Sequence, residues 1–308
     1  MSGAVITGWG IGLPDKILTN DDLASRLDTS DEWITERTGI KRRYIGGTTS
    51  GLAIEAGRQA LERAGRLPSD VDLLILATTT PDRMVPGTSA AVQDGIGTTG
   101  GAFDINAACS GFVYALVAAH GMIAAGARRI LVIGSETLSR ITDWDDRKLA
   151  ILVGDGAGAV LLEAIDGPGQ LLGWDLGSDG SAGHLLACEH GGFLTMDGKE
   201  VFRRAVRVVV ESCTIAMGKA GLTPQDIDLF IPHQANGRII ASAGEKLGIP
   251  EDRWVLTIDR YGNTSSASIP LAMADALDTG RLQAGMNVLL TGFGGGMTWA
   301  SAVLRWGG

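Results

Sequence analysis

A cysteine, a histidine and an asparagine stand in segments whose residues suit chemistry, and the cysteine has the most suggestive setting. Cys109 lies in AFDINAACSGF (102–112), where a predicted strand runs into a turn of small residues and a helix begins at or just after the cysteine. The positive end of a helix dipole favours the nucleophilic thiolate, and Gly111 leaves room for a substrate. Since a lone cysteine is as often a buried structural residue, this segment alone leaves both interpretations open.

His233 and Asn263 each follow a different local pattern. His233, in FIPHQANGRI (230–239), comes directly after a predicted buried strand, at the end where α/β proteins place functional side chains. A surface histidine is the favoured alternative when this segment is taken alone. Asn263, in RYGNTSSASIP (260–270), stands in a polar turn before a helix, where an N-cap cluster is the alternative. The glycines of FGGGMTW (293–299) join two predicted strands and could offer backbone N–H groups to an oxyanion.

A glycine motif that resembles a nucleotide fingerprint fails the test of its context. GDGAGA (154–159) is followed by AVLLE, which predicts a strand, whereas a dinucleotide fingerprint opens a helix. We therefore expect no NAD, and we place Gly154, Gly156 and Gly158 at a tight turn. No spacing of histidine, cysteine and aspartate suggests a metal site, so neither a metal nor a cofactor is predicted.

Short apolar segments alternate with helical patterns along the chain, which predicts an α/β protein with mixed or parallel sheets covered on both faces. Helices are predicted at residues 30–38, 51–64, 88–96, 110–125, 199–219, 237–247 and 268–278. Strands are predicted at residues 4–8, 73–77, 102–105, 130–133, 150–153, 159–163, 229–231, 254–257, 288–290 and 300–305.

The chain contains an internal repeat. LERAGRLPSDVDLLI (61–75) recurs as MGKAGLTPQDIDLFI (217–231) at an offset of 156 residues, and ILVIG (130–134) recurs as VLLTG (288–292) at 158. Both repeated segments occur in the same order and at nearly the same offset. This favours an internal duplication over the general similarity that αβ units share in any α/β protein. We expect two similar halves, residues 1–165 and 166–308, that meet at the turn cluster DGPG (166–169).

Composition limits the possible partners. Glycine makes up 45 of 308 residues, but 45% hydrophobic and 20% charged residues indicate a packed globular protein rather than a repeat or linker. A net charge of −9 disfavours nucleic acid. Three cysteines favour a reducing compartment, and neither a leader peptide nor an apolar stretch long enough for a bilayer is evident. The expectation is a cytoplasmic protein without a membrane partner.

Taken together and in order, six segments resemble one family. They are DTSDEWITERTGI (28–40), DINAACSGF (104–112), GDGAGA (154–159), PHQANGRI (232–239), NTSSASIP (263–270) and FGGGMTW (293–299). Across essentially its whole length the chain is similar to β-ketoacyl-ACP synthase III, a condensing enzyme of the thiolase superfamily. The resemblance implies a thiolase-like fold, with two similar βαβ-type halves in a five-layered α-β-α-β-α arrangement.

The resemblance implies an activity and a catalytic triad. Cys109, His233 and Asn263 match the Cys-His-Asn triad, and the backbone N–H groups of Cys109 and Gly296 match the oxyanion hole. The cysteine would take an acyl group from acyl-CoA, which is a substrate rather than a cofactor. Malonyl-ACP would then lose carbon dioxide to give an enolate held by the histidine and asparagine, and β-ketoacyl-ACP would form. This condensation initiates fatty acid biosynthesis.

The family's binding positions also match. Trp33 and Arg147 correspond to the pair around the adenine of CoA, Arg37 to a phosphate contact, and Thr29 and Asn236 to the CoA tunnel. For the acyl pocket the matches are Phe112 and Val85. Relatives often carry phenylalanine at the position of Val85. The smaller valine side chain leaves more room in the acyl pocket, so we expect primers that are branched or longer than acetyl.

The acidic carrier protein needs a basic patch on this acidic chain. Glu245 departs from the family, where this docking helix often has a basic residue. Candidate docking residues are Arg203, Arg204, Arg207, Arg238 and Lys246, although their spacing equally fits a solvated helix face. The family also implies a homodimer in which the Val85 loop crosses to the partner subunit.

Several other functions compete with this reading. A biosynthetic thiolase would need a second cysteine near the C-terminal glycine loop, and no cysteine follows Cys213. Synthases of types I and II would carry a second histidine in place of Asn263. A starter ketosynthase or acyltransferase of a polyketide pathway would keep the same triad and stays open. A non-catalytic partner subunit is disfavoured by the intact triad.

Overall fold

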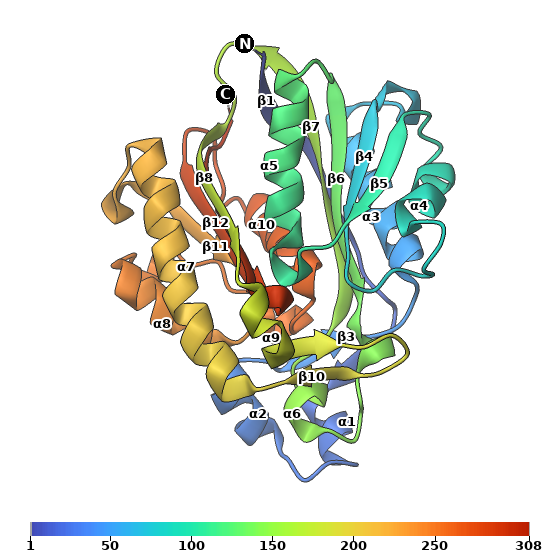
Figure 1. Ribbon diagram of the computed structural model, residues 1–308, viewed down its shortest axis with the longest axis vertical. Coiled ribbons are helices and arrows are strands. Elements are labelled where there is room, and N and C mark those ends of the chain that lie inside the picture. Colours follow the sequence, from blue (N-terminus) through green and yellow to red (C-terminus); the bar gives the residue numbers. More distant parts are fainter. Residues whose placement is uncertain (1, 308) are drawn as a thin grey trace.

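The computed structural model describes residues 2–307 and is built on two β-sheets (Figure 1). In the first sheet β4 runs parallel to β5 and β6, while β7 is antiparallel to β6 and β1. In spatial order its strands are β1 (Ser2–Gly12), β7 (Asp155–Asp166), β6 (Arg129–Thr137), β4 (Leu73–Ala77) and β5 (Gly101–Ile105).

The second sheet repeats this pattern with one strand fewer. Its strands in spatial order are β8 (Leu171–Ser178), β13 (Thr298–Arg305), β12 (Asn287–Gly294) and β11 (Leu229–Pro232). Here β11 and β12 are parallel, and β13 is antiparallel to both of its neighbours.

Helices form three layers around these sheets. Between the sheets lie α5 (Gly111–Ala124) and α10 (Ser268–Asp278), whose buried side chains share one apolar core with strands of both sheets (Figure 1). The outer face of the first sheet packs against α3 (Thr49–Ala64) and α4 (Thr88–Ile96). The outer face of the second packs against α7 (Gly198–Ala220) and α8 (Gly237–Leu247). The predicted five-layered α-β-α-β-α arrangement is confirmed.

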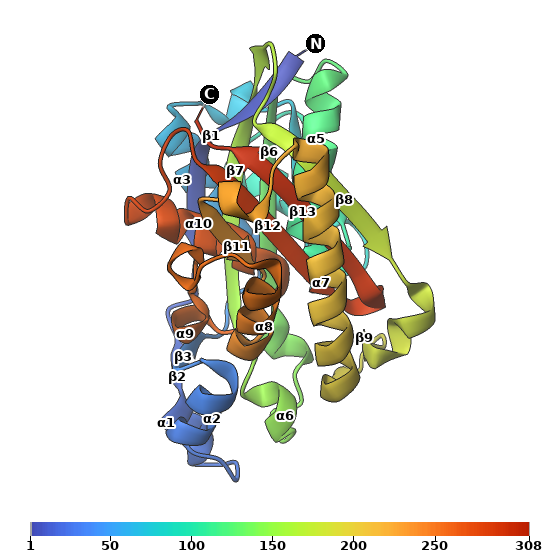
Figure 2. The same cartoon turned by 90° about the vertical axis from the view of Figure 1, so that its left-hand side faces the viewer.

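Short elements gather at one end of the molecule, below the sheets in Figure 2. Several share a small apolar cluster formed by Leu18, Leu23, Ile34, Ile40, Ile151 and Ile258. These elements are β2 (Ile17–Thr19), α1 (Asn20–Ala24), α2 (Asp31–Thr38), β3 (Arg42–Tyr44), α6 (Arg147–Ala150) and α9 (Ile258–Tyr261). A hairpin of β9 (Leu186–Cys188) and β10 (Leu194–Met196) precedes α7.

The repeated segments fold alike. Each begins as a helix that ends at a left-handed glycine, Gly65 after α3 and Gly221 after α7, because glycine adopts positive φ without a steric cost. Each continues through a proline-led 3₁₀ turn into a buried strand. Asp72 and Asp228 then accept from backbone N–H groups at the start of the parallel neighbour strand. The proposed division of the chain at residues 165 and 166 stays a prediction.

Two predicted strands were wrong. Residues 150–153 form the end of α6 and a turn, because Asp146 caps a helix there through Lys148 N. Residues 254–257 make a single parallel bridge, Phe230 with Trp254, at the position that β5 occupies in the first sheet. Conversely, β8 was not predicted, because its glycines interrupt the apolar alternation.

The prediction of a tight turn at the GDGAGA motif was also wrong. Gly156 and Gly158 lie inside β7. A Cβ at Gly158 would come within 2.7 Å of the Pro270 Cβ, because the start of α10 crosses the strand at this point. The glycines therefore serve close packing between sheet and helix.

Within residues 2–307 no helix is long and apolar enough to cross a membrane. In the same residues no group of three or more histidine, cysteine, aspartate or glutamate side chains is placed to hold a metal ion.

Candidate functional site

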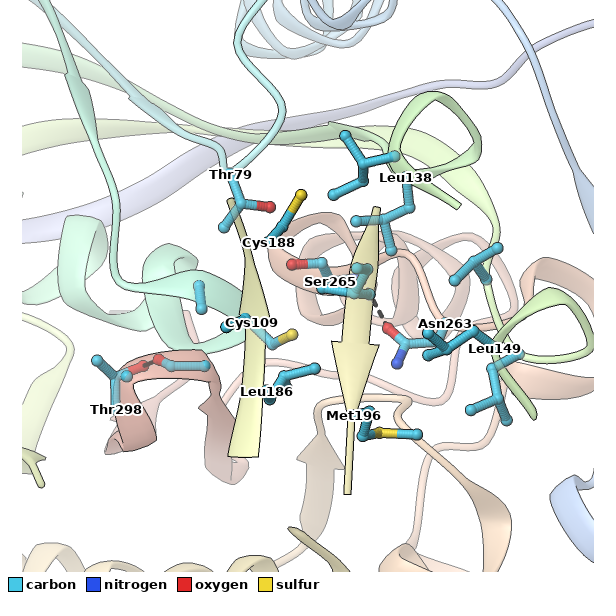
Figure 3. Close-up of a pocket in the computed structure, with 18 of the residues that line it drawn as sticks. Thr79, Cys109, Leu138, Leu149, Leu186, Cys188, Met196, Asn263, Ser265 and Thr298 are labelled. Atoms are coloured by element: carbon cyan, nitrogen blue, oxygen red, sulfur yellow. Dashed lines mark hydrogen bonds between the residues drawn. The ribbon is translucent and has the colours of Figure 1, made fainter. Parts of the chain in front are cut away.

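A cavity of about 430 Å³ lies where three turns meet (Figure 3). The turns are those after β5, before α10 and after β12, and they contribute Cys109, Asn263 and Gly296. The β9–β10 hairpin closes one side with Leu186, Cys188, Leu194 and Met196, and further apolar walls come from Leu138, Ile141, Leu149, Leu152 and Val153.

Cys109 stands in a short 3₁₀ turn, residues 108–110, between β5 and α5. Ala108 before it has a positive φ of 47°, which is unusual for a residue other than glycine. Burial raises the pKa of the Cys109 thiol to about 12, the charge of Glu136 also raises it, and a hydrogen bond from Ser265 lowers it. The sequence-based expectation that the helix dipole favours the thiolate is therefore outweighed by burial.

His233 follows β11 and is only 3% exposed. Its Nδ1 lies 2.6 Å from Ser268 Oγ, and Gln234 N donates to the same oxygen. Among the described residues Nδ1 is the only acceptor near that hydroxyl proton, so the serine donates to Nδ1 and the ring proton resides on Nε2. Burial lowers the pKa of His233 to about 3, which leaves the imidazole neutral with Nε2–H as a donor.

Asn263 is fixed through both its backbone and its side chain. Its N–H donates to Leu152 O and its carbonyl accepts from Gly154 N, both at 2.8 Å. Its Oδ1 accepts from Ser265 N at 2.9 Å, as the dashed line in Figure 3 shows. No described residue accepts from Nδ2, so this amide group is left to serve the cavity as a donor.

The structure brings Cys109, Asn263 and Gly296 to one cavity, and His233 is not among the residues that line it. His233 lines a small neighbouring gap together with Phe293, whose ring lies edge-on at a centroid distance of 5.8 Å. The end of β12 packs closely against the turn of Cys109, because a Cβ at Gly294 would come within 2.5 Å of Cys109 N. Gly296, with φ of 96°, turns the chain after this strand.

Three of the five predicted CoA residues line a second hollow of about 360 Å³ that shares Leu152 and Met196 with the cavity. Trp33, Arg37 and Asn236 line it, and Asn236 also caps α8. The guanidinium groups of Arg37 and Arg147 stack on the Trp33 ring, at 4.6 and 4.8 Å from its centroid. Thr29 does not line the hollow, and its Oγ1 is buried without a hydrogen-bond partner.

The two residues predicted for the acyl pocket lie apart from the cavity of this chain. Phe112 is fully buried in the core between the sheets. Val85 is 83% exposed in the loop before α4, next to the exposed Met84. Neither is a lining residue, so their role in primer selection stays a prediction.

The basic residues predicted for carrier docking differ in how free they are. Arg203 and Arg204 pair with Glu200 and Asp179. Arg207, Arg238 and Lys246 are exposed, and Arg238 also lines the hollow with Trp33.

Sequence reasoning missed the hairpin wall of the cavity and the buried Glu136. Strands of three residues, such as β9 and β10, carry no measurable alternation. The contacts of Glu136 come from segments that are far apart in the chain, so no local pattern reveals them.

Known proteins resemble this chain along its whole length. Residues 103–180 match the family described as 3-oxoacyl-[acyl-carrier-protein (ACP)] synthase III, and residues 217–306 match its C-terminal part. A β-ketoacyl-[acyl-carrier-protein] synthase III of Bacillus anthracis is 46% identical over 308 residues, covering 98% of each chain.

Solved structures agree with this match. The 3-oxoacyl-[acyl-carrier-protein] synthase III of Aquifex aeolicus has a TM-score of 0.97 at 45% identity and covers 99% of this chain and 100% of its own. The priming β-ketosynthase of the R1128 polyketide pathway has a TM-score of 0.94 at 35% identity, covering 99% and 96%. The chain therefore belongs to the 3-oxoacyl-[acyl-carrier-protein] synthase III family, whose members are thiolase-fold condensing enzymes.

Proposed function

We propose that this enzyme joins an acyl-CoA primer to malonyl-ACP by decarboxylative Claisen condensation, giving β-ketoacyl-ACP at the start of fatty acid biosynthesis. Cys109 is the nucleophile, and His233 and Asn263 stabilise the enolate. The observation that carries this proposal is a matched pair of N–H donors. Ser268 Oγ bonds to His233 Nδ1, which leaves Nε2–H as a donor. Ser265 N donates to Asn263 Oδ1, which leaves Nδ2 as a donor.

In the first step the Cys109 sulfur attacks the thioester carbon of acyl-CoA. The backbone N–H groups of Cys109 and Gly296 hold the oxyanion. The bond from carbon to the CoA sulfur breaks, and the proton of the Cys109 thiol leaves with CoA as its free thiol. Because burial raises the pKa of Cys109, the thiol is protonated near neutral pH in the free enzyme and must lose its proton as the bond to the acyl carbon forms.

In the second step the malonyl group loses carbon dioxide, and negative charge moves to the thioester oxygen. The two N–H donors stabilise this enolate, and the loss of one such donor typically costs about 10²–10³ in rate. A neutral His233 suits this role, because its Nε2–H donates a hydrogen bond without the ring having to carry a charge in the buried site. The enolate carbon then attacks the acyl carbon of acyl-Cys109, the bond from that carbon to sulfur breaks, and the freed thiolate takes a proton from water.

Coenzyme A lies in the hollow beside α2 in this proposal. The adenine enters between Trp33 and Arg147, Arg37 meets a phosphate, and Asn236 lines the tunnel. A contact of Thr29 with the tunnel stays a prediction from the family match. Stacked aromatic groups keep their centroids about 4.5 Å or more apart, so a ring between two such groups needs roughly twice that separation. Arg147, now 4.8 Å from the Trp33 ring, must therefore move aside as the adenine binds.

The primer occupies the apolar part of the cavity. Val85 of the partner subunit closes its end, and Phe112 supports the turn of Cys109 from the core between the sheets. Met84 and Val85 are exposed as a pair of apolar side chains, which supports a homodimer in which this loop meets the partner subunit. The smaller Val85 admits branched and longer primers. This idea fails if acetyl-CoA exceeds isobutyryl-CoA and hexanoyl-CoA by more than about tenfold in kcat/KM. V85F serves as the matched narrow variant.

The carrier protein docks on the basic side chains Arg203, Arg207, Arg238 and Lys246 around α7 and α8. Arg238 also borders the CoA hollow, so reversing its charge would disturb both substrates. R207E avoids this problem: it should raise KM for malonyl-ACP and leave acylation by acyl-CoA unchanged. R58E on α3, in the opposite outer layer, is the control. If both variants raise KM for malonyl-ACP equally, the carrier does not dock on the face of α7 and α8.

Mass spectrometry tests the function itself. Acyl-CoA should add one acyl group to Cys109, and malonyl-ACP should then remove it with release of carbon dioxide. A chain that is never acylated would instead be a non-catalytic subunit. The likeness to the R1128 priming β-ketosynthase keeps a polyketide starter enzyme as the second candidate. Rates of condensation measured with primers and carrier proteins of both pathways, with malonyl-CoA as a control, distinguish the fatty acid enzyme from the polyketide starter enzyme. The proposed setting is the cytoplasm.

A further inference from the structure

Glu136, near the end of β6, is a fully buried acidic residue that the proposed reaction leaves without a role. No cation pairs with it among residues 2–307. Instead its two oxygens accept from Thr78 Oγ1, Thr79 N, Thr79 Oγ1, Thr80 Oγ1, Ser265 Oγ and Ser266 Oγ. A buried carboxylate without a cation is costly to keep, so these contacts call for an explanation.

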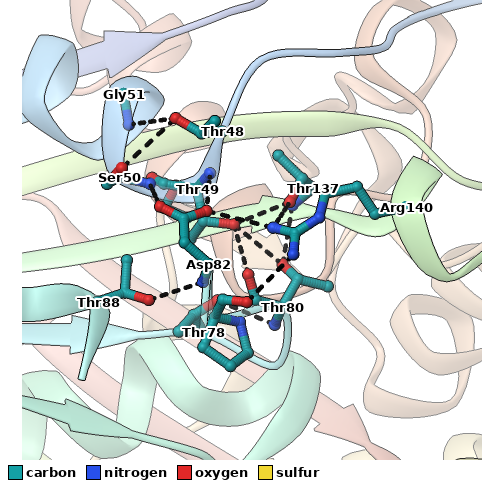
Figure 4. A network of polar contacts seen from close by, with 12 residues as sticks. Thr48, Thr49, Ser50, Gly51, Thr78, Thr80, Asp82, Thr88, Thr137 and Arg140 are labelled. Carbon is teal, nitrogen blue, oxygen red and sulfur yellow. Dashed lines mark hydrogen bonds and ion pairs between the residues drawn. The ribbon is translucent and has the colours of Figure 1, made fainter. Parts of the chain in front are cut away.

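One side of this cluster is rigid. Thr80 Oγ1 donates to Glu136 at 2.6 Å and accepts from Thr137 N at 2.8 Å. Thr49 Oγ1 in turn bonds Thr80 O and Thr137 Oγ1, and Figure 4 shows this network closing around the loop after β4. The carboxylate is thereby held in place from the first sheet.

The other side of the cluster is strained. Ser265, whose Oγ donates to Glu136 at 3.0 Å, has a positive φ of 49°. Only Ala108, beside Cys109, shares this feature among the non-glycine residues of the part that the structure describes. A left-handed residue with a Cβ persists only where its surroundings hold it, and the bond to Glu136 supplies such a hold.

The strained residue orients the carboxamide of Asn263. Ser265 N donates to Asn263 Oδ1 at 2.9 Å, and this bond leaves Nδ2 to the cavity (Figure 3). If Ser265 relaxed to negative φ, its N–H would turn away. The carboxamide could then rotate and present Oδ1, which repels an enolate oxygen.

We propose that Glu136 is a positioning residue that holds Ser265 in its left-handed conformation and so keeps Asn263 Nδ2 directed at the developing enolate. This inference rests on the proposed function, since it assigns a task only in the decarboxylation step. It predicts a defect in that step beyond any change in acylation that follows from losing the hydrogen bond of Ser265 to Cys109.

Two substitutions of Ser265 test the conformational part. Ser265→Ala and Ser265→Gly both remove the hydroxyl, but only glycine adopts the left-handed conformation without strain. S265A should lower carbon dioxide release from malonyl-ACP by about tenfold or more, whereas S265G should stay within about threefold of the wild type. Both variants lose the Ser265 hydroxyl beside Cys109 and should change acylation equally, so the ratio of decarboxylation to acyl-Cys109 formation is compared between them. Equal decarboxylation rates in the two variants would overturn the proposal.

A double variant tests Glu136 itself. E136Q should slow decarboxylation without slowing acylation. Adding S265G should restore the decarboxylation rate, because glycine adopts the left-handed conformation at residue 265 without the hydrogen bond to Glu136. A merely structural role of Glu136 predicts no such rescue. Unfolding midpoints verify that each variant folds. If E136Q/S265G is no faster than E136Q, Glu136 does not act through Ser265 and the proposal is wrong.

The same measurements separate this inference from the proposed function. If the wild-type chain neither accepts an acyl group nor releases carbon dioxide, the proposed function fails. If N263A loses decarboxylation but S265A and S265G behave alike, the proposed function stands and only the role of Glu136 falls.

Discussion

At Cys109, burial and the start of a helix act on the thiol in opposite directions. A helix dipole stabilises a nearby anion by at most about 2 kcal/mol. Removal from water can shift a pKa by about 3–5 units. The sequence revealed the helix start after Cys109, but it could not reveal how completely the cavity walls surround the sulfur, because those walls come from distant segments.

Alkylation measures this balance directly. Because burial raises the pKa of Cys109 to about 12, its reaction with iodoacetamide should accelerate with every rise in pH between about pH 6 and pH 9.5, without a plateau. Peptide mass spectrometry follows Cys109, with the exposed Cys188 as the internal comparison. A plateau with a midpoint below about pH 8 would show that the thiolate is already stabilised in the free enzyme.

At the scale of elements, the reliable predictions came from strong local signals. The bounds of α4 and α8 agree with the sequence, because apolar periodicity and a glycine at each C-terminus mark them. The strands β2 and β3 were missed, since three residues are too few to show alternation. The glycines of β7 were misread as a turn, because their reason is the approach of a helix from another part of the chain.

Gly158 provides a test of that packing. An added methyl group would meet Pro270 and the backbone of Leu271 at less than 3 Å, so G158A should lower the free energy of unfolding by about 1–3 kcal/mol. G183A is the matched control, because no atom lies within 4 Å of its Cβ position and its φ is not positive. Urea unfolding measures both, and equal stabilities would contradict the close contact between β7 and α10.

Across the whole molecule, histidines with little contact to water couple stability to pH. His120, on α5 between the sheets, has its pKa lowered by burial, and its Nε2 is buried without a partner. A histidine whose folded pKa lies below its unfolded value of about 6.5 costs stability as the pH falls through that value.

H120Q removes this titration. The wild type should therefore lose more unfolding free energy than H120Q when the pH is lowered from about 7.5 to about 5.5. His233 titrates equally in both proteins and cancels in the comparison. Parallel stability curves for the two proteins would show that His120 is not held neutral by the fold.

The two sheets also divide the chemistry. Cys109 follows a strand of the first sheet and His233 a strand of the second, whereas Asn263 stands before α10 and pairs with the segment before β7. The sequence identified all three, because each stands in a conspicuous motif. It did not identify Ser265, Ser268 or Glu136 as supports, because their tasks depend on contacts between segments that only folding brings together.

Single-turnover kinetics of H233A and N263A test the central claim most directly. Rapid quenching and mass spectrometry would record acyl-Cys109 formation and carbon dioxide release separately. If Cys109 acts alone in acylation and the two donors act in decarboxylation, both variants should acylate within about fivefold of the wild type and decarboxylate about 10²–10³ times more slowly. Acylation that falls as far as decarboxylation would contradict this division of labour.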